Sequence, residues 1–190
     1  MNLMGALIVQ MSLFWTFFDL ILQSTYVTNI ALNKATYMSS QFELSTGSDK
    51  AVDGGKTPTY AGRQCAISFG GQTALWRVDL GVLSSIHHIT IYPRTENFPW
   101  DETNGYLRRL LGFSVYVTNT TDKEDGSICF YDNEFYTPST IPEIPTINCK
   151  MHGIYVIFYN ERKQGQPSYY EPEAFVELCE FEVYGKHYFL

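Results

Sequence analysis

Short apolar runs, separated by clusters of Gly, Pro, Asn and Asp, make up most of the chain after its first 28 residues. Apolar and polar positions alternate in residues 75–81, 110–119 and 178–185, as expected for strands with one buried face. Residues 85–93 are rich in β-branched side chains, and residues 153–160 are almost all apolar or aromatic, as in a central strand. Without a long helical period, the pattern predicts an all-β antiparallel sandwich.

Two long connections separate these predicted strands. Residues 94–109 and 161–175 are polar segments that contain Pro, Gly and aromatic side chains. Long ordered loops on a rigid sandwich are common binding sites, but composition alone leaves a plain surface connection equally open.

The N-terminal segment is apolar and contains no Lys or Arg before Lys34. We interpret residues 1–28 as a secretory signal peptide, residues 29–185 as the domain and residues 186–190 as a short tail. An uncleaved signal-anchor is the alternative, but Asp19 lies within the apolar run and an aspartate is costly in hydrocarbon. In both cases the domain faces an oxidising compartment, so we expect a secreted, extracellular protein.

Composition narrows the possible partners. The 190 residues are 45% hydrophobic, which excludes a disordered chain, and the net charge of -7 argues against nucleic acid. The aromatic content of 16% favours strands and recognition surfaces. The four cysteines indicate two disulfides, for which three pairings are possible. Asn119 begins an Asn-Thr-Thr sequon, so we expect it on the surface and glycosylated.

The sequence carries no signature of catalysis. It has no hydrolase elbow, phosphate loop, dinucleotide fingerprint or Cys-x-x-Cys pair. His87 and His88 are neighbours in a predicted strand, so their rings should point to opposite faces and not share a metal. We therefore expect a protein that is not an enzyme.

Residues 51–65 raise the question of a cation site. Asp53 precedes Gly54 and Gly55, and on this stretch alone a turn is the favoured interpretation. A hard cation would need loop carbonyls and a second carboxylate. Glu180 could supply the second carboxylate if a disulfide joined Cys65 to Cys179, the residue directly before Glu180.

Several segments together carry a family resemblance. "NIALNKATYMSS", "AVDG", "WRVDLG", "YPRT" and "ELCEFEVYG" occur in the order found in F-type lectins, or fucolectins, which the chain resembles over residues 29–185. The resemblance implies a jelly-roll-like β-sandwich of the galactose-binding-domain type. Residues 94–109 and the strand "HHITIY" are most similar to fucolectin-like domains of molluscan multiple-EGF-like, scavenger-receptor-type proteins.

The resemblance also implies disulfides and a structural calcium ion. It pairs Cys65 with Cys179 and Cys129 with Cys149, which would stabilise the fold by roughly 4.7 and 3 kcal/mol in the chain-entropy model. Given this resemblance, we favour a cation site over a simple turn at residues 51–65. The implied calcium ligands are the side chains of Asp53 and Glu180 and the backbone carbonyls of Lys50, Gly55, Gln64 and Cys179.

The implied sugar site is only partly preserved. Arg94 and Arg109 match the two arginines that hold the sugar in the family, and Tyr60 offers an aromatic face. Ile67 stands where the family has a histidine, and Thr95-Glu96 follows Arg94 where the family has Gly-Asp. The family's adjacent cysteine pair is absent. Alternatively, the arginines form only loop salt bridges with acidic neighbours, namely Glu96, Asp101 or Glu102.

The family resemblance and the partly preserved sugar site suggest two possible functions. The first is a secreted, calcium-stabilised lectin-like module that binds cell-surface or microbial glycans, of the fucose type or diverged from it, in recognition or innate defence. Homo-oligomerisation would offset a weak single site. The second is a protein-interaction or adhesion module that keeps the scaffold and has lost fucose binding.

Overall fold

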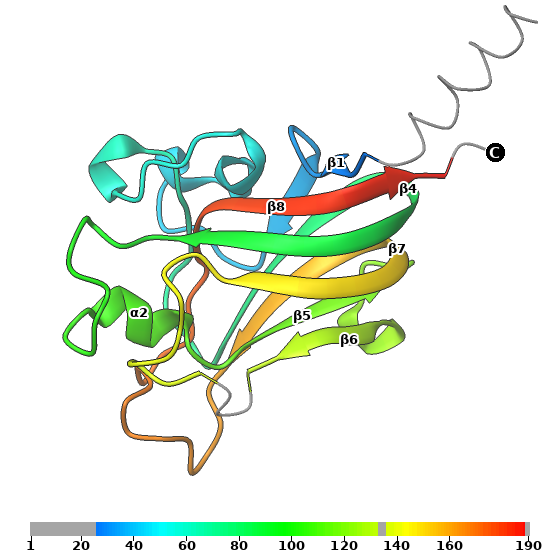
Figure 1. The fold of residues 1–190 in the computed structure, drawn as a ribbon. Helices are drawn as coiled ribbons and strands as arrows, with labels where there is room; N and C mark the ends of the chain where they lie inside the picture. The colour runs from blue at the N-terminus through cyan, green and yellow to red at the C-terminus, as the bar shows by residue number, and fades with distance from the viewer. Residues whose placement is uncertain (1–25, 133–135, 189–190) are drawn as a thin grey trace, which may run out of the picture.

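The computed structural model describes residues 26–132 and 136–188, which form an antiparallel β structure with short helical turns (Figure 1). The strands are β1 (Thr28–Asn29), β2 (Ala35–Met38), β3 (Ala66–Ile67), β4 (Thr73–Pro93), β5 (Phe113–Thr118), β6 (Ser127–Tyr131), β7 (Thr146–Glu161) and β8 (Glu177–His187). The helical elements are α2 (Gly105–Leu110) and the 3-10 turns η1 (Leu44–Thr46), η2 (Ser48–Val52), η3 (Tyr60–Gly62) and η4 (Lys123–Asp125).

Hydrogen bonds join the described strands in the order β1-β8-β4-β7-β5-β6, with β2 paired to β4 and β3 to β8. Every one of these pairings is antiparallel. The predicted all-β antiparallel sandwich is therefore confirmed, and the strands β4 and β7 run through both of its layers.

The predicted strands 75–81 and 85–93 are one bent strand, β4. Its pairing with β7 is interrupted between Asp79 and Ser84, where Gly81 adopts a left-handed φ of 83° that favours glycine. Before the break β4 also pairs with β2, and after it β4 pairs with β8. The two halves belong to opposite layers, so Trp76 on the first half meets Phe181 of β8 in the core, with ring centroids 4.9 Å apart.

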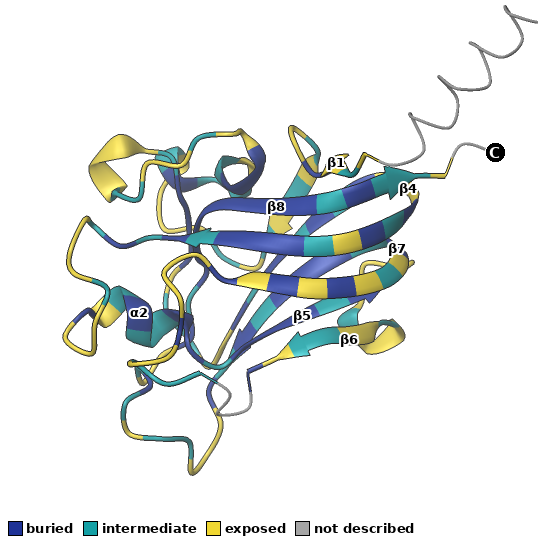
Figure 2. Ribbon diagram, in the orientation of Figure 1, coloured by how far each residue is buried: buried dark blue, intermediate teal, exposed yellow. Residues whose placement is uncertain are grey.

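The alternation predicted for β5 is confirmed. Phe113, Val115 and Val117 are buried, and the ring of Phe113 stacks on Phe158 of β7 at 5.5 Å. The predicted strand began too early, because Leu110 ends the helix α2. Residues 177–183 of strand β8 are buried on both faces, since η2 covers the outer side, and Figure 2 draws most of the strand in dark blue.

Helix α2 lies within the first long connection and was not predicted. Asn104 caps it by accepting a hydrogen bond from the backbone N–H of Tyr106, and Leu107 and Leu110 anchor it in the core. Six residues are too few for a periodic signal in the sequence.

Both disulfides pair as the resemblance implies. Cys65 bonds Cys179 across a separation of 114 residues, next to β3 and within β8. Cys129 on β6 bonds Cys149 in the first half of β7, so this bridge joins the two layers.

One expectation about the histidines is wrong. The pairing of β4 with both neighbours shifts between Ile86 and His88, and this irregularity brings His87 and His88 together. Their Nδ1 atoms lie 2.9 Å apart, and the ring of His88 stacks on Tyr184 at 4.5 Å. A bulge cancels the strict alternation on which the expectation rested.

The proposed leader lies almost wholly in residues 1–25, outside the described residues. Within the described residues no helix is both long and apolar enough to span a membrane. Strand pairing begins at Thr28 opposite Gly185, and β8 continues to His187. Asn119 is exposed immediately after β5, as expected for a surface sequon.

Candidate functional site

The candidate sugar site lies at the loop end of the sandwich, on the left in Figure 1, where α2 lies. Arg94 directly follows β4, and its backbone N–H donates to the carbonyl oxygen of Glu177, the first residue of β8, at 3.2 Å. Arg109 lies in the last turn of α2. Strand pairing and a capped helix thus bring together three residues that are far apart in the sequence.

A single buried carboxylate holds the two arginines. The Nη1 atoms of Arg94 and Arg109 each donate to Oε1 of Glu177 at 3.0 Å. Glu177 is 7% exposed, and its Oε2 has no hydrogen-bond partner among the described residues. Burial raises the pKa of this carboxyl, and the two guanidinium groups oppose that rise. The shared carboxylate fixes the two cations side by side.

Arg94 also pairs with an acidic neighbour in its own loop. Oε1 of Glu96 accepts hydrogen bonds from Nε of Arg94 at 2.5 Å and from the backbone N–H of Tyr60 at 2.7 Å. Of the acidic neighbours considered from the sequence, Glu96 therefore does form a salt bridge with Arg94. Within the described residues, neither Asp101 nor Glu102 forms an ion pair with either arginine. Glu96 has a left-handed φ of 54°, which is uncommon for a residue with a long side chain.

Aromatic rings surround both guanidinium groups. The ring centroid of Tyr106 lies 4.5 Å from Cζ of Arg94 and 5.1 Å from Cζ of Arg109. Phe175 approaches Arg109 to 4.4 Å, and Tyr60 lies 5.5 Å from Arg94 with 36% of its surface exposed. Cation–π attraction therefore adds to the ion pairs in fixing the two cations.

The two arginines and Tyr60 can offer hydrogen-bond donors and an aromatic face to a ligand only on the outer side of the site. A cavity of about 10 Å³ beneath Arg109 and Tyr106 has room for no more than about one water. The side chains of Arg94 and Arg109 keep 14% and 30% of their surface exposed. A ligand would accept hydrogen bonds from the remaining guanidinium N–H groups and contact Tyr60 at the rim.

Ile67 contributes no polar group to this site. It pairs with Glu177 across β3 and β8, and its side chain is 3% exposed and packs with Cys65 and Cys179. The position where the family carries a histidine therefore belongs to the core in this chain.

Sequence reasoning missed Glu177, Tyr106 and Phe175. Alternation along β8 did not reveal the burial of Glu177, because the pairing of β8 with β4 shifts between Tyr92 and Pro93. A carboxylate on a core-facing side needs cationic partners. The partners themselves could be assigned only from the strand register.

Glu180 is the main evidence for a cation site. It points away from Phe181 and is nevertheless fully buried, because η2 and the following turn cover it. Its Oε2 accepts a hydrogen bond from the backbone N–H of Gly54 at 3.1 Å, while its Oε1 is buried without a partner among the described residues. Burial raises the pKa of Glu180 to about 7, and nearby carboxylates add to the rise.

The other implied calcium ligands lie around the same turn. Oδ1 of Asp53 accepts from the backbone N–H of Gly55 at 2.8 Å, and its Oδ2 lies 3.6 Å from the ammonium of Lys50. The side-chain amide of Gln64 packs against Gly55 so closely that a Cβ there would lie 2.7 Å from its carbon. The Cys65–Cys179 bond ties this turn to β8 beside Glu180.

The donor chemistry of this cluster fits a calcium ion. Two carboxylates and main-chain carbonyls are hard oxygen ligands, and one carboxylate oxygen is unpaired. Across residues 26–132 and 136–188, no group of three or more His, Cys, Asp or Glu side chains could hold a metal. A site here would therefore depend on backbone carbonyls for most of its ligands.

Comparison with known proteins gives a match in structure and none in sequence. No protein-family model matches the chain, and no curated protein matches its sequence. A fucose-binding module of Streptococcus pneumoniae, SpX-3, superposes with a TM-score of 0.61 at 22% identity, covering 83% of this chain and 97% of that one. The chain has the fold of fucose-binding lectin modules.

Two further neighbours show how widely the fold is used. The F-type lectin from striped bass (Morone saxatilis) serum matches with a TM-score of 0.66 at 21% identity, over 85% of this chain and 50% of the lectin. The chain thus spans about half the length of that lectin. A chitosan-binding module from Paenibacillus sp. IK-5, solved with chitotriose, matches with a TM-score of 0.58 at 22% identity, over 83% of this chain and 100% of the module.

Proposed function

We propose that this protein is a secreted, non-enzymatic carbohydrate-binding module diverged from the F-type lectins. The fold shared with fucose-binding and chitosan-binding modules supports the proposal. The observation that carries it is the arginine pair on Glu177, which presents fixed hydroxyl donors beside Tyr60. Sugars need this combination of directional hydrogen bonds and an apolar face.

The ligand is a glycan other than a simple terminal fucose. Ile67 removes one of the family's three donors, and a lost hydrogen bond to a designed polar partner costs roughly 1–3 kcal/mol. In this chain Glu96 also lies at this rim, where its Oε1 already accepts from Arg94 and from the backbone N–H of Tyr60, so its Oε2 is the oxygen that would accept from a ligand hydroxyl. The site therefore offers donors and an acceptor to a diverged cell-surface or microbial glycan.

Calcium has a structural role in this proposal. Asp53 and Glu180 would hold the ion with the carbonyls of Lys50, Gly55, Gln64 and Cys179, and the ion would supply positive charge to the buried oxygen of Glu180. The turn after η2 would then be fixed to β8, and β8 begins with Glu177, three residues before Glu180. Removing the ion would loosen the base of the sugar site.

A glycan array tests the proposal. The full chain, produced by secretion, is applied with calcium and with EDTA, alongside the Arg109→Ala and Tyr60→Ala variants. Arg77→Ala is the matched control, because Arg77 stacks on Tyr37 on the sheet face, away from the loop end. We expect calcium-dependent binding that both site variants weaken and the control keeps. A folded protein that binds no glycan would contradict the proposal.

A protein-interaction module is the second candidate, and one surface favours it. The exposed rings of Phe42, Tyr60 and Phe69 are in contact, with centroids 6.2 and 5.5 Å from that of Phe42, and Leu44 nearby in sequence is 99% exposed. Clustered exposed apolar side chains mark interaction surfaces. Capture of a cell-surface protein that Phe42→Ala abolishes, without any glycan binding, would favour this candidate.

A further inference from the structure

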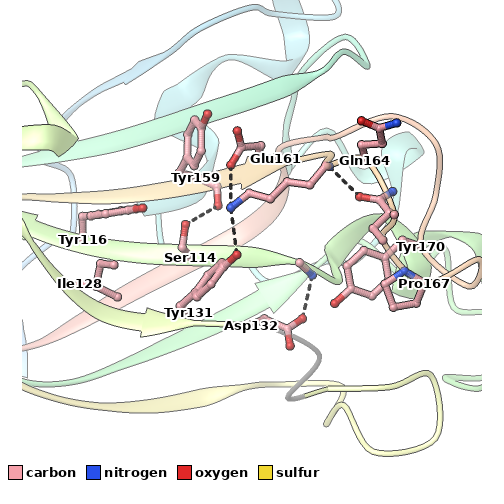
Figure 3. Close-up of a pocket in the computed structure, with 14 residues that line it drawn as sticks. Ser114, Tyr116, Ile128, Tyr131, Asp132, Tyr159, Glu161, Gln164, Pro167 and Tyr170 are labelled. Atoms are coloured by element: carbon pink, nitrogen blue, oxygen red, sulfur yellow. Dashed lines mark hydrogen bonds and ion pairs between the residues drawn. The ribbon is translucent and has the colours of Figure 1, made fainter.

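A second concave surface lies on the outer face of the sheet formed by β5, β6 and β7 (Figure 3). Arg94, Arg109 and Glu177 are not among the residues that line it. Figure 3 shows Tyr116 and Ile128 at one end, Gln164, Pro167 and Tyr170 at the other, and Ser114 between Tyr131 and Tyr159.

Strand register explains why this face is hollow. Ser114 on β5 lies directly between Tyr131 on β6 and Tyr159 on β7. A small side chain flanked by two large aromatic ones leaves a trough between the rings. The hydroxyl of Ser114 donates to the carbonyl oxygen of Tyr159 at 3.2 Å, so it adds no unpaired polar group to the floor.

Aromatic surface continues along the groove. Tyr116 pairs with Ile128 in the next outward-facing row, and its ring meets that of Tyr159 edge to face at 6.5 Å. Tyr131 is 40% exposed and Ile128 55% exposed. Exposed tyrosine rings give rigid, amphipathic contact area at low entropic cost.

The charged side chains that line the groove are one ammonium and two carboxylates. The ammonium of Lys163 lies 3.0 Å from the hydroxyl of Tyr131 and 3.3 Å from Oε2 of Glu161. The carboxylate of Asp132 accepts a hydrogen bond from the backbone N–H of Gly112 at 2.7 Å. Donors and acceptors therefore alternate at the rim without an excess of positive charge, which suits a neutral ligand rich in hydroxyl groups.

We propose that this groove binds a short neutral oligosaccharide, as a glycan subsite separate from the arginine pair. Its volume of about 320 Å³ lies at the lower end of the range of about 300–1,000 Å³ for small-molecule sites. The inference deepens the proposed function and rests on it. Two subsites on one module let a single glycan, or two neighbouring ones, engage both and gain avidity.

The face of the sheet favours a saccharide over an added peptide strand. Strand addition uses the backbone of an edge strand, whereas this groove lies over Ser114, whose strand is hydrogen-bonded on both sides. Glu161 and Asp132 line the groove and disfavour an anionic ligand.

Calorimetric titration of the full chain tests the proposal. The probes are neutral trisaccharides, namely cellotriose, laminaritriose, mannotriose and N-acetylchitotriose, with a sulfated trisaccharide for comparison. The Arg109→Ala background removes the contribution of the loop end. In that background we expect at least one neutral trisaccharide to bind, and Tyr131→Ala to weaken it at least about fivefold.

Two matched variants keep the result interpretable. Tyr131→Phe preserves the ring and the fold and should weaken binding only about twofold to threefold, since it removes one hydrogen-bonding hydroxyl. Tyr37→Ala removes a similarly exposed tyrosine, 47% exposed, outside the groove and should leave binding unchanged.

The possible failures are distinguishable. If the unmodified chain binds a glycan with an affinity that Tyr131→Ala leaves unchanged and Arg109→Ala abolishes, the groove proposal is overturned and the proposed function stands. Binding of the sulfated probe alone also overturns it. If no glycan binds the unmodified chain on the array or in solution, the proposed function itself fails.

Discussion

Glu177→Gln is the sharpest test of how the loop end is built. The substitution keeps the shape of the side chain and one carbonyl acceptor, but it removes the negative charge between Arg94 and Arg109. Two guanidinium groups then lie side by side with one carboxylate, that of Glu96, left to Arg94. The expected result is a less stable protein.

The size of the loss follows from the burial of the partners. Breaking a fully buried ion pair by removing one partner costs about 3–5 kcal/mol. The exposed fractions of 14% for the side chain of Arg94 and 30% for that of Arg109 allow solvent to screen part of the repulsion. Arg94 also keeps Glu96. We therefore expect a loss of about 2 kcal/mol in the free energy of unfolding.

Urea denaturation followed by tryptophan fluorescence measures this loss at fixed calcium concentration. Glu173→Gln is the control, because Glu173 is an exposed carboxylate in the connection that precedes β8, and it should change stability by less than about 0.5 kcal/mol. A double-mutant cycle with Arg109→Gln should give a coupling of about 1 kcal/mol. A loss for Glu177→Gln no larger than that of the control would refute the buried carboxylate as the element that holds both arginines.

Three further predictions concern calcium, the disulfides and pH. Calcium at about 100 times its dissociation constant should stabilise the protein by about 2.7 kcal/mol, or raise Tm by roughly 5–10 °C, and Glu180→Gln should abolish this shift. An equal Tm with calcium and EDTA would contradict the site. Replacing Cys65 and Cys179 together by Ala should lower stability by about 2–5 kcal/mol, measured by urea denaturation, and no change would count against the role of this bridge. Burial lowers the pKa of His88, with His87 adding to the effect, so the folded state favours the neutral ring. The contribution of His88 to stability is therefore fully present above the unfolded pKa of about 6.5, and it is lost as the pH falls below that value. Between neutral pH and about pH 5, the Tm of the unmodified chain should fall further than the Tm of the His88→Gln variant. Equal decreases in Tm would contradict a role of His88 in the pH dependence of stability.

Periodicity predicted most of the long strands, because burial on one face leaves alternation in the sequence. It could not show that residues 75–81 and 85–93 are one strand, since Gly81 and the bulge before Ser84 resemble a turn. It also missed α2, whose six residues are anchored by tertiary contacts of Leu107 and Leu110.

The site was harder to predict than the fold. The resemblance to F-type lectins pointed to Arg94, Arg109 and Tyr60, and the structure brings all three to one end of the sandwich. It did not indicate that Glu177 joins the arginines, because that contact depends on the pairing of β4 with β8 and on the docking of α2. Nor could spacing along single strands reveal the trough over Ser114, which depends on the register of three strands.

A glycan bound at the arginine pair should protect the loop end from amide exchange. Hydrogen–deuterium exchange of the full chain, with and without the strongest glycan from the array, measures this protection. We predict slower amide exchange in residues 58–62 and 94–110 on binding, lost in Arg109→Ala. A bound glycan that leaves exchange in both segments unchanged would contradict binding at the arginine pair.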